Sequence, residues 1–178
     1  AHPHFAGNQE IAIIHNGIIE NYAYLKTALE KEGHVFNSET DTEVLVHLIE
    51  EIQNRDNLTL DEAVRIALNE VIGAYAIVVI DRKNPDQLVA ARKGSPLVVG
   101  IGEDEFFLAS DATPIVEYTK NVVYLKDEEM AIVSRNGSLT IKTIGNEMKT
   151  PYVQKLEMEI EMLEKGGYDH YMLKEIHQ

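Results

Sequence analysis

The chain has 178 residues, of which 44% are apolar and 26% charged, and its formal net charge is −14 at pH 7; this composition fits one globular domain with a sizeable core. An acidic chain without a basic patch repels phosphate backbones and anionic lipid, and no apolar run reaches the ~18 residues that cross a membrane, so we expect neither nucleic-acid nor membrane binding. The absence of Cys excludes disulfides and thiolate metal sites. Because the sequence also shows no basic and apolar leader, we expect a cytoplasmic location.

The first predicted elements meet at an Asn-Gly pair. Residues 11–14 form an apolar strand pattern, and Asn16-Gly17 follows it. Asn-Gly is a common signal for a tight hairpin turn, yet here a helical pattern comes next. The stripe of that helix is Ile18, Tyr22, Leu25 and Leu29, and Gly33 can end it. We therefore expect a strand–turn–helix junction at Asn16-Gly17.

Two further helices are predicted over residues 40–52 and 59–73. Thr40 and Glu43 stand at capping-box spacing at the start of the first helix, and Thr59 and Glu62 do so at the start of the second. Apolar residues recur at helical spacing behind both boxes. Residues 18–72 are thus expected to form a zone of consecutive helices.

Short strands are predicted after the helices. Several are continuous apolar runs, which is typical of strands buried on both faces. Asn136-Gly137 lies between two alternating patterns and predicts a plain hairpin, while residues 112–119 could hold a short helix. The predicted strands are 74–80, 87–92, 96–101, 105–110, 121–125, 129–134 and 139–144.

The last predicted element is an acidic helix over residues 152–165. Gly166-Gly167 ends it and makes the tail a candidate linker. Consecutive helices followed by consecutive strands indicate an α+β layered sandwich and argue against a doubly wound sheet.

Three candidate motifs carry little chemistry. Gly100 and Gly102 form a Gly-x-Gly without a third glycine or a following helix, so we interpret them as a turn. His2, His4 and His15 match no common metal-ligand spacing, and no carboxylate accompanies them, so no metal site is expected. No Ser stands in a nucleophile-elbow motif.

Asn16-Gly17 has two interpretations. The end of a strand before a helix leaves backbone N–H groups pointing outward, near the positive end of the helix dipole. Gly17 lets a ligand approach the backbone, and Asn16 adds an amide donor, so the pair can form an oxyanion hole for an acyl-transfer intermediate. The alternative is that the pair is only a helix entry.

Asp41 also has two compatible interpretations. It is a first-turn carboxylate that stabilises the helix that Thr40 caps. It can also be the counter-ion for the ammonium group of a ligand, because a helix N-terminus favours the ionised form that such a contact needs.

Several stretches together resemble the class II glutamine amidotransferases. They are "HNGIIEN" at 15–21, "SETDTEV" at 38–44, "GAYAIVVID" at 73–81, "GSPLVVGIG" at 94–102 and "ASD" at 109–111. The tail "YDHYMLKEI" at 168–176 looks like the junction to a sugar-isomerase half, as in the members of this family that make glucosamine 6-phosphate. The resemblance covers essentially the whole chain.

The resemblance implies a four-layer αββα sandwich of the N-terminal-nucleophile hydrolase type, incomplete at its N-terminal side. It implies that an N-terminal Cys attacks the side-chain amide of glutamine, and that Asn16 and Gly17 form the oxyanion hole. Asp41 would hold the α-amino group of glutamine, so Gly17 and Asp41 would be the residues that bind substrate. No cofactor is implied. Released ammonia would reach a sugar-isomerase domain that acts on fructose 6-phosphate. The implied boundaries are 1–165 for a partial glutaminase domain and 166–178 for the start of a linker.

The chain departs from the family in having no Cys. We expect the chain to be an internal piece of a glutaminase domain that is inactive by itself and homo-oligomeric. The complete protein is expected to be an enzyme. The alternative is a non-catalytic glutamine-binding or regulatory module of the same fold.

Overall fold

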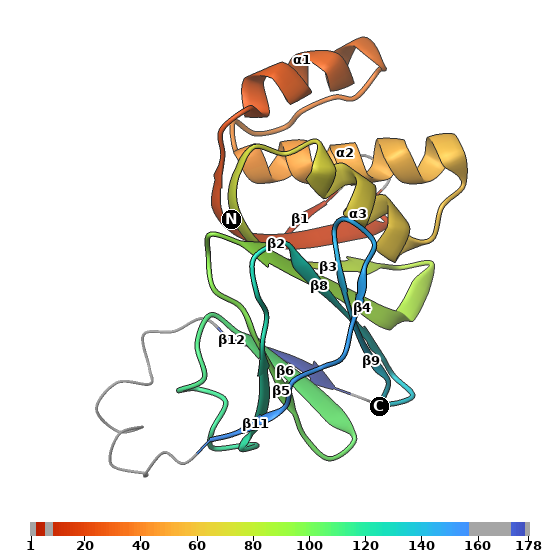
Figure 1. Cartoon of the computed structure of the whole chain (residues 1–178). Helices are drawn as coiled ribbons and strands as arrows, with labels where there is room; N and C mark the ends of the chain where they lie inside the picture. The colour runs from red at the N-terminus through yellow and green to blue at the C-terminus, as the bar shows by residue number, and fades with distance from the viewer. Residues whose placement is uncertain (1–2, 6–8, 157–171, 177–178) are drawn as a thin grey trace.

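Three helices and two antiparallel sheets form successive layers in the computed structural model (Figure 1). The structure describes residues 3–5, 9–156 and 172–176. The helices are α1 (Tyr22–Lys31), α2 (Asp41–Asp56) and α3 (Leu60–Asn69). They lie together on one side of the larger sheet, and the smaller sheet lies on the other side.

The larger sheet has seven strands in the spatial order β1-β2-β3-β4-β8-β9-β10. Their bounds are β1 (His4–Phe5), β2 (Ile11–Ile19), β3 (Gly73–Asp81), β4 (Asn84–Lys93), β8 (Glu129–Ser134), β9 (Leu139–Thr143) and β10 (Met148–Lys149). The smaller sheet has five strands in the order β11-β7-β5-β6-β12. Their bounds are β11 (Gln154–Lys155), β7 (Asn121–Tyr124), β5 (Val98–Ile101), β6 (Glu105–Ala109) and β12 (Met172–Ile176).

The larger sheet is buried on both faces. Alternate residues of β3 point to opposite sides, so Ile77 packs in the core beneath the helices while Val78 packs in the core between the sheets. Leu45 and Ile49 of α2 belong to the first of these cores. This double burial explains the continuous apolar runs of the predicted strands.

The predicted α+β sandwich is confirmed, and so are the seven predicted strands. Within the described residues, regular helices occur in one layer only. The outer face of the smaller sheet is covered by residues 112–119, where Ile115 is buried and Val116 N–H donates to the Ala112 carbonyl. This segment forms helical turns and no regular helix.

The strand–turn–helix junction predicted at Asn16-Gly17 is wrong. Strand β2 continues through both residues and pairs with β3 as far as Ile19 opposite Gly73. Helix α1 begins only at Tyr22, and Ile18 is 69% exposed in the strand and does not face the helical core. The reason is tertiary: β3 offers a partner for every residue of β2, which overrides the helical spacing that begins at Ile18.

The predicted starts of the next two helices are confirmed, with Thr40 and Thr59 as N-caps. Neither threonine makes a side-chain capping bond. Glu43 does turn back, but its carboxylate accepts the Asn37 N–H at 2.7 Å and the Ser38 hydroxyl. The loop before α2 is therefore fastened to the first turn of that helix.

The C-terminal prediction needs a correction. Gln154 and Lys155 pair with β7, so no helix begins at residue 152. Residues 157–165 of that predicted helix lie outside the described part. Within the tail predicted as a linker, Met172–Ile176 pairs with β6 as an edge strand of the smaller sheet.

The hairpin predicted at Asn136-Gly137 is confirmed between β8 and β9. The left-handed φ of +91° belongs to Gly137. Asn136 acts through its side chain, whose Oδ1 accepts the Ser138 N–H at 3.0 Å. Its amide is thus used in a local turn.

A partly buried ion pair ties α3 to β9 and makes stability depend on pH. Lys142 Nζ lies 3.1 Å from Asp61 Oδ2. Burial raises the pKa of Asp61, but bonds from the Thr59 hydroxyl and the Lys142 ammonium outweigh burial and lower the pKa below its ordinary value. The stability that this carboxylate supplies is therefore complete above the unfolded pKa, at pH ~4, and is lost as the pH falls through the lowered folded pKa.

We expect Asp61→Asn to be less stable than the unchanged protein near neutral pH and to approach it in acid. The measurement is the free energy of urea unfolding for both proteins between neutral pH and pH ~3. A difference that stays constant over this range would contradict the assigned role of Asp61.

Candidate functional site

The end of β2 approaches β3 unusually closely at two glycines. Gly17 has a φ of +120°, and a Cβ placed on it would lie 2.3 Å from the Ala74 carbonyl oxygen. Gly73 of β3 has a φ of +132°, and its Cβ would lie 2.2 Å from the Ile18 carbonyl oxygen. Real side chains do not tolerate such contacts with backbone, so both positions require glycine. This close approach is between the two strands, and the approach of a ligand to Gly17 stays a prediction.

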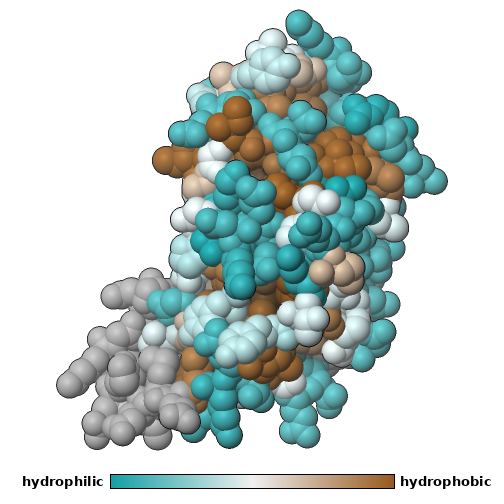
Figure 2. Space-filling view, in the orientation of Figure 1, coloured by the Kyte–Doolittle hydropathy of each residue, from teal (hydrophilic) through white to brown (hydrophobic). Residues whose placement is uncertain are grey.

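A hollow of about 780 Å³ opens beside this close approach. Its volume falls in the range of small-molecule sites. Lys93 and Glu20 contribute opposite charges to it, while Ile18 and Ile72 are largely exposed at it. The lining residues are Gly17, Ile18, Glu20, Val71, Ile72, Gly73, Ala74, Lys93 and Ser95. Figure 2 shows that apolar surface emerges between polar side chains on the face drawn there.

Asn16 belongs to the other side of β2. It lines a narrow cavity between the two sheets with Ile14, Ala76 and Ser110, and it is exposed. Within the described part of the chain, its amide makes no hydrogen bond, whereas Asn21 uses both ends of its amide, on the Glu70 carbonyl and the Ile72 N–H. Asn16 therefore keeps an amide donor available at the surface.

Asp41 lies at the first residue of α2 and reaches the end of β2. Its Oδ2 accepts the Ile19 N–H at 2.8 Å, and its Oδ1 lies 4.0 Å from His15 Nδ1. His15 is buried and is also 3.0 Å from the Thr42 hydroxyl. About a quarter of the Asp41 side chain is exposed. The carboxylate is thus bonded to the backbone of β2 and is still accessible to a ligand.

The structure brings the three predicted site residues to one end of β2 but not into one cavity. Gly17 lines the hollow and Asn16 the cavity between the sheets, and Asp41 lines neither. The arrangement offers an amide donor, backbone of a strand that a ligand can approach, and an anchored carboxylate. A carboxylate suits an ammonium group, and neutral N–H donors suit a negatively charged oxygen. The chain contains no Cys, and therefore no thiol that could attack an amide bound there.

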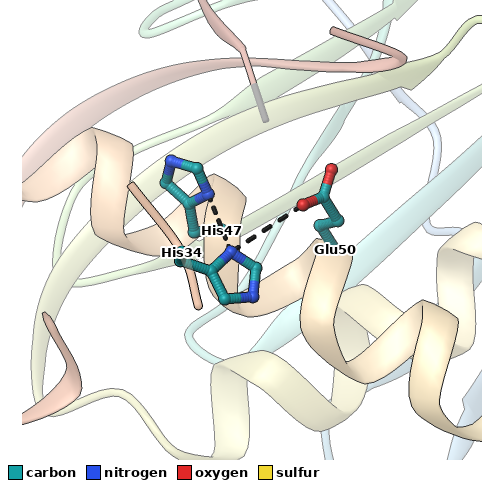
Figure 3. Close-up of side chains that lie close together, drawn as sticks. All are labelled: His34, His47 and Glu50. Carbon is teal, nitrogen blue, oxygen red and sulfur yellow. Dashed lines mark hydrogen bonds and ion pairs between the residues drawn. The ribbon is translucent and has the colours of Figure 1, made fainter. Parts of the chain in front are cut away.

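The three histidines of the sequence analysis belong to the N-terminal part of the chain. His4 lies in β1 and His15 in β2, while His2 is outside the described residues. Sequence reasoning overlooked another group, His34, His47 and Glu50, whose ligand atoms lie within 4.8 Å of one another (Figure 3). The i, i+3 spacing of His47 and Glu50 on a helix was the signal that could have found it.

Comparisons with known proteins agree with the fold and show the family of the chain. Residues 1–117 match the family described as "Glutamine amidotransferase domain". The chain is 59% identical over 176 residues to the glutamine–fructose-6-phosphate aminotransferase [isomerizing] of Bacteroides thetaiotaomicron, and 57% identical over 177 residues to that of Chlorobaculum tepidum. Each match covers 99% of this chain and 29% of the relative, so the chain spans under a third of the length of these proteins.

Solved structures show the same fold. The glutamine phosphoribosylpyrophosphate amidotransferase of B. subtilis superposes with a TM-score of 0.65 at 27% identity. The match covers 80% of this chain and 31% of that one. A structure described as the allosteric regulatory enzyme of purine biosynthesis gives a TM-score of 0.64 at 28% identity, over 79% of this chain and 30% of that one.

Proposed function

Because the chain belongs to the glutamine amidotransferase domain family, we propose that the end of β2 and the start of α2 form part of a site that binds glutamine and hydrolyses its side-chain amide. The observation that carries this proposal is the unused amide of Asn16 next to Gly17, on the strand to which Asp41 is bonded. In the proposed site, the Asn16 amide and the Gly17 N–H donate to the oxyanion of the tetrahedral intermediate, and Asp41 binds the α-ammonium group.

We extend the proposal to the reaction of the relatives. The ammonia released from glutamine is used to convert fructose 6-phosphate to glucosamine 6-phosphate, in a sugar-isomerase domain outside these residues. The identity of 59% over nearly the whole chain supports this assignment, since the relative is named for glutamine and fructose 6-phosphate. The nucleophile is a Cys that these 178 residues do not contain.

The proposal includes a cytoplasmic location and a homo-oligomer. Glutamine and phosphorylated sugars are cytoplasmic metabolites, which supports the location. Within the described residues, no helix combines the length and the apolar character needed to span a membrane. Ile18 and Ile72, exposed by 69% and 61%, are apolar surface that a second copy could cover.

One experiment separates the proposed function from a module that only binds glutamine. The full gene product that carries these residues, here called the full-length protein, is assayed with glutamine and fructose 6-phosphate beside the 178-residue chain alone. We expect glutamate and glucosamine 6-phosphate from the full-length protein and no hydrolysis above background from the chain. A full-length protein that binds glutamine but releases no glutamate would overturn the proposal in favour of a binding module.

We expect Asp41→Asn to raise the KM for glutamine by the equivalent of about 1.5–3 kcal/mol, the value of a charge-assisted hydrogen bond. The variant should melt nearly normally, because the Asn Oδ1 can still accept the Ile19 N–H and Asn suits a helix start. The measurements are glutamine kinetics and thermal melting of the full-length protein.

Asp61→Asn is the matched control for Asp41→Asn. Asp61 is also a first-turn carboxylate, but it pairs with Lys142 at 3.1 Å between α3 and β9. The control should lower the melting temperature and leave the KM for glutamine unchanged. Unchanged glutamine kinetics together with a lower melting temperature for Asp41→Asn would leave that residue with a structural role only.

A further inference from the structure

A pair of imidazoles meets a carboxylate between the loop after α1 and the middle of α2 (Figure 3). His34 Nδ1 lies 3.0 Å from His47 Nδ1 and 3.8 Å from Glu50 Oε1. The side chains are enclosed, with exposures of 10% for His34, 2% for His47 and 11% for Glu50. Donors bound to one tetrahedral ion at 2.0–2.1 Å lie roughly 3.3 Å apart, so the observed separations need only small adjustments.

The outer nitrogens of both imidazoles face carboxylates. His34 Nε2 lies 2.9 Å from Glu51 Oε1, and His47 Nε2 lies 3.3 Å from Glu43 Oε2. In the tautomers in which each Nε2 donates to its carboxylate, each Nδ1 is an acceptor with a lone pair. Two lone pairs 3.0 Å apart repel each other unless a cation lies between them. The contacts with Glu51 and Glu43 are those that orient metal-bound histidines in proteins.

The charge around the imidazoles also favours a cation. Glu43, Glu50 and Glu51 surround the two rings. Glu43 is itself fixed by the Asn37 N–H and the Ser38 hydroxyl, which hold the second carboxylate in place.

We propose that His34 Nδ1, His47 Nδ1 and the Glu50 carboxylate bind one Zn²⁺ ion, with Glu51 and Glu43 orienting the two histidines. Two imidazoles and one carboxylate are a ligand set that zinc accepts, with a water completing the tetrahedron. Such an ion would fasten the loop that begins at Gly33 to α2, the helix whose first residue is Asp41. The site is separate from the glutamine site, and its test does not depend on the proposed function.

The test is calorimetric titration of ZnCl₂ into the full-length protein after treatment with a chelator. We expect one saturable site that depends on the cluster. Glu51→Gln should weaken zinc binding about 10–100-fold, as the loss of an orienting carboxylate typically does. Glu50→Gln and His34→Ala should weaken it further, because each removes a ligand. Glu32→Gln, an exposed carboxylate at the end of α1, is the matched control and should bind zinc normally.

A second measurement separates loss of the ligand from loss of the fold. Thermal melting in the presence of chelator should be similar for the unchanged protein and Glu50→Gln, and added zinc should raise the melting temperature of the unchanged protein only. Zinc binding that is undetectable, or equally tight in Glu50→Gln and in Glu32→Gln, would overturn the proposal. In that case a shared proton holds the two imidazoles together.

Discussion

Asn16→Ala in the full-length protein should lower the kcat of glutamine hydrolysis by ~10²–10³, the effect of removing one oxyanion donor, or about 2.7–4 kcal/mol. The donor matters most when the tetrahedral oxygen is negative, so kcat should fall more than KM changes. The structure adds a reason to expect normal stability. Within its described part, the Asn16 amide bonds to no other group, so its removal leaves no buried group without a partner.

Asn136→Ala is the matched control in the same chain. Its amide oxygen accepts the Ser138 N–H in the hairpin between β8 and β9. Removing that bond should cost on the order of 0.5–1.5 kcal/mol of stability and leave kcat unchanged. The two variants are compared by glutaminase kinetics and thermal melting. Full kcat in both would mean that Asn16 is only a strand residue and that the oxyanion assignment is wrong.

Gly17→Ala should damage both stability and activity. The new Cβ would lie 2.3 Å from the Ala74 carbonyl oxygen and 2.8 Å from the Ala74 carbonyl carbon, so β2 and β3 must separate at this point. The positive φ adds strain for any residue with a side chain. Together these effects should cost about 2–5 kcal/mol, and the displaced strand should carry Asn16 out of register with the substrate.

Gly33→Ala separates the effect of backbone strain at a positive φ from the effect of a steric clash. Gly33 has a φ of +97°, but a Cβ on it would meet nothing within 4 Å. This control should lose about 1–2 kcal/mol and keep its glutaminase activity. Thermal melting and glutamine hydrolysis of both variants provide the comparison. Equal losses of stability for Gly17→Ala and Gly33→Ala would show that the approach of β2 to β3 is looser than the structure has it.

The sequence predicted the elements whose patterns depend on local burial. The strands between residues 74 and 144 are apolar because both faces of the sheets are covered, and Thr40 and Thr59 stand at helix starts that a short-range pattern can reveal. It failed where a distant partner decides the conformation. Strand β3 extends β2 through Ile18, and β7 recruits Gln154 and Lys155 into a strand.

The candidate site shows the same division. The resemblance led to Asn16, Gly17 and Asp41, and the structure puts all three at one end of β2 or bonded to it. The physical argument given for Asn16-Gly17, a helix dipole at the junction, was wrong because α1 begins five residues after Gly17, at Tyr22. The contact between His34 and His47 could not be predicted, because it depends on how the loop after α1 folds back on α2.

The most direct test of the glutamine site is a crystal structure of the full-length protein with glutamate bound. We expect the α-ammonium group of glutamate within hydrogen-bond distance of the Asp41 carboxylate, and an oxygen of its side chain within reach of the Asn16 amide and the Gly17 N–H. Glutamate bound elsewhere, with Asp41 contacting only the Ile19 N–H and Asn16 facing solvent, would contradict the site proposed for this chain.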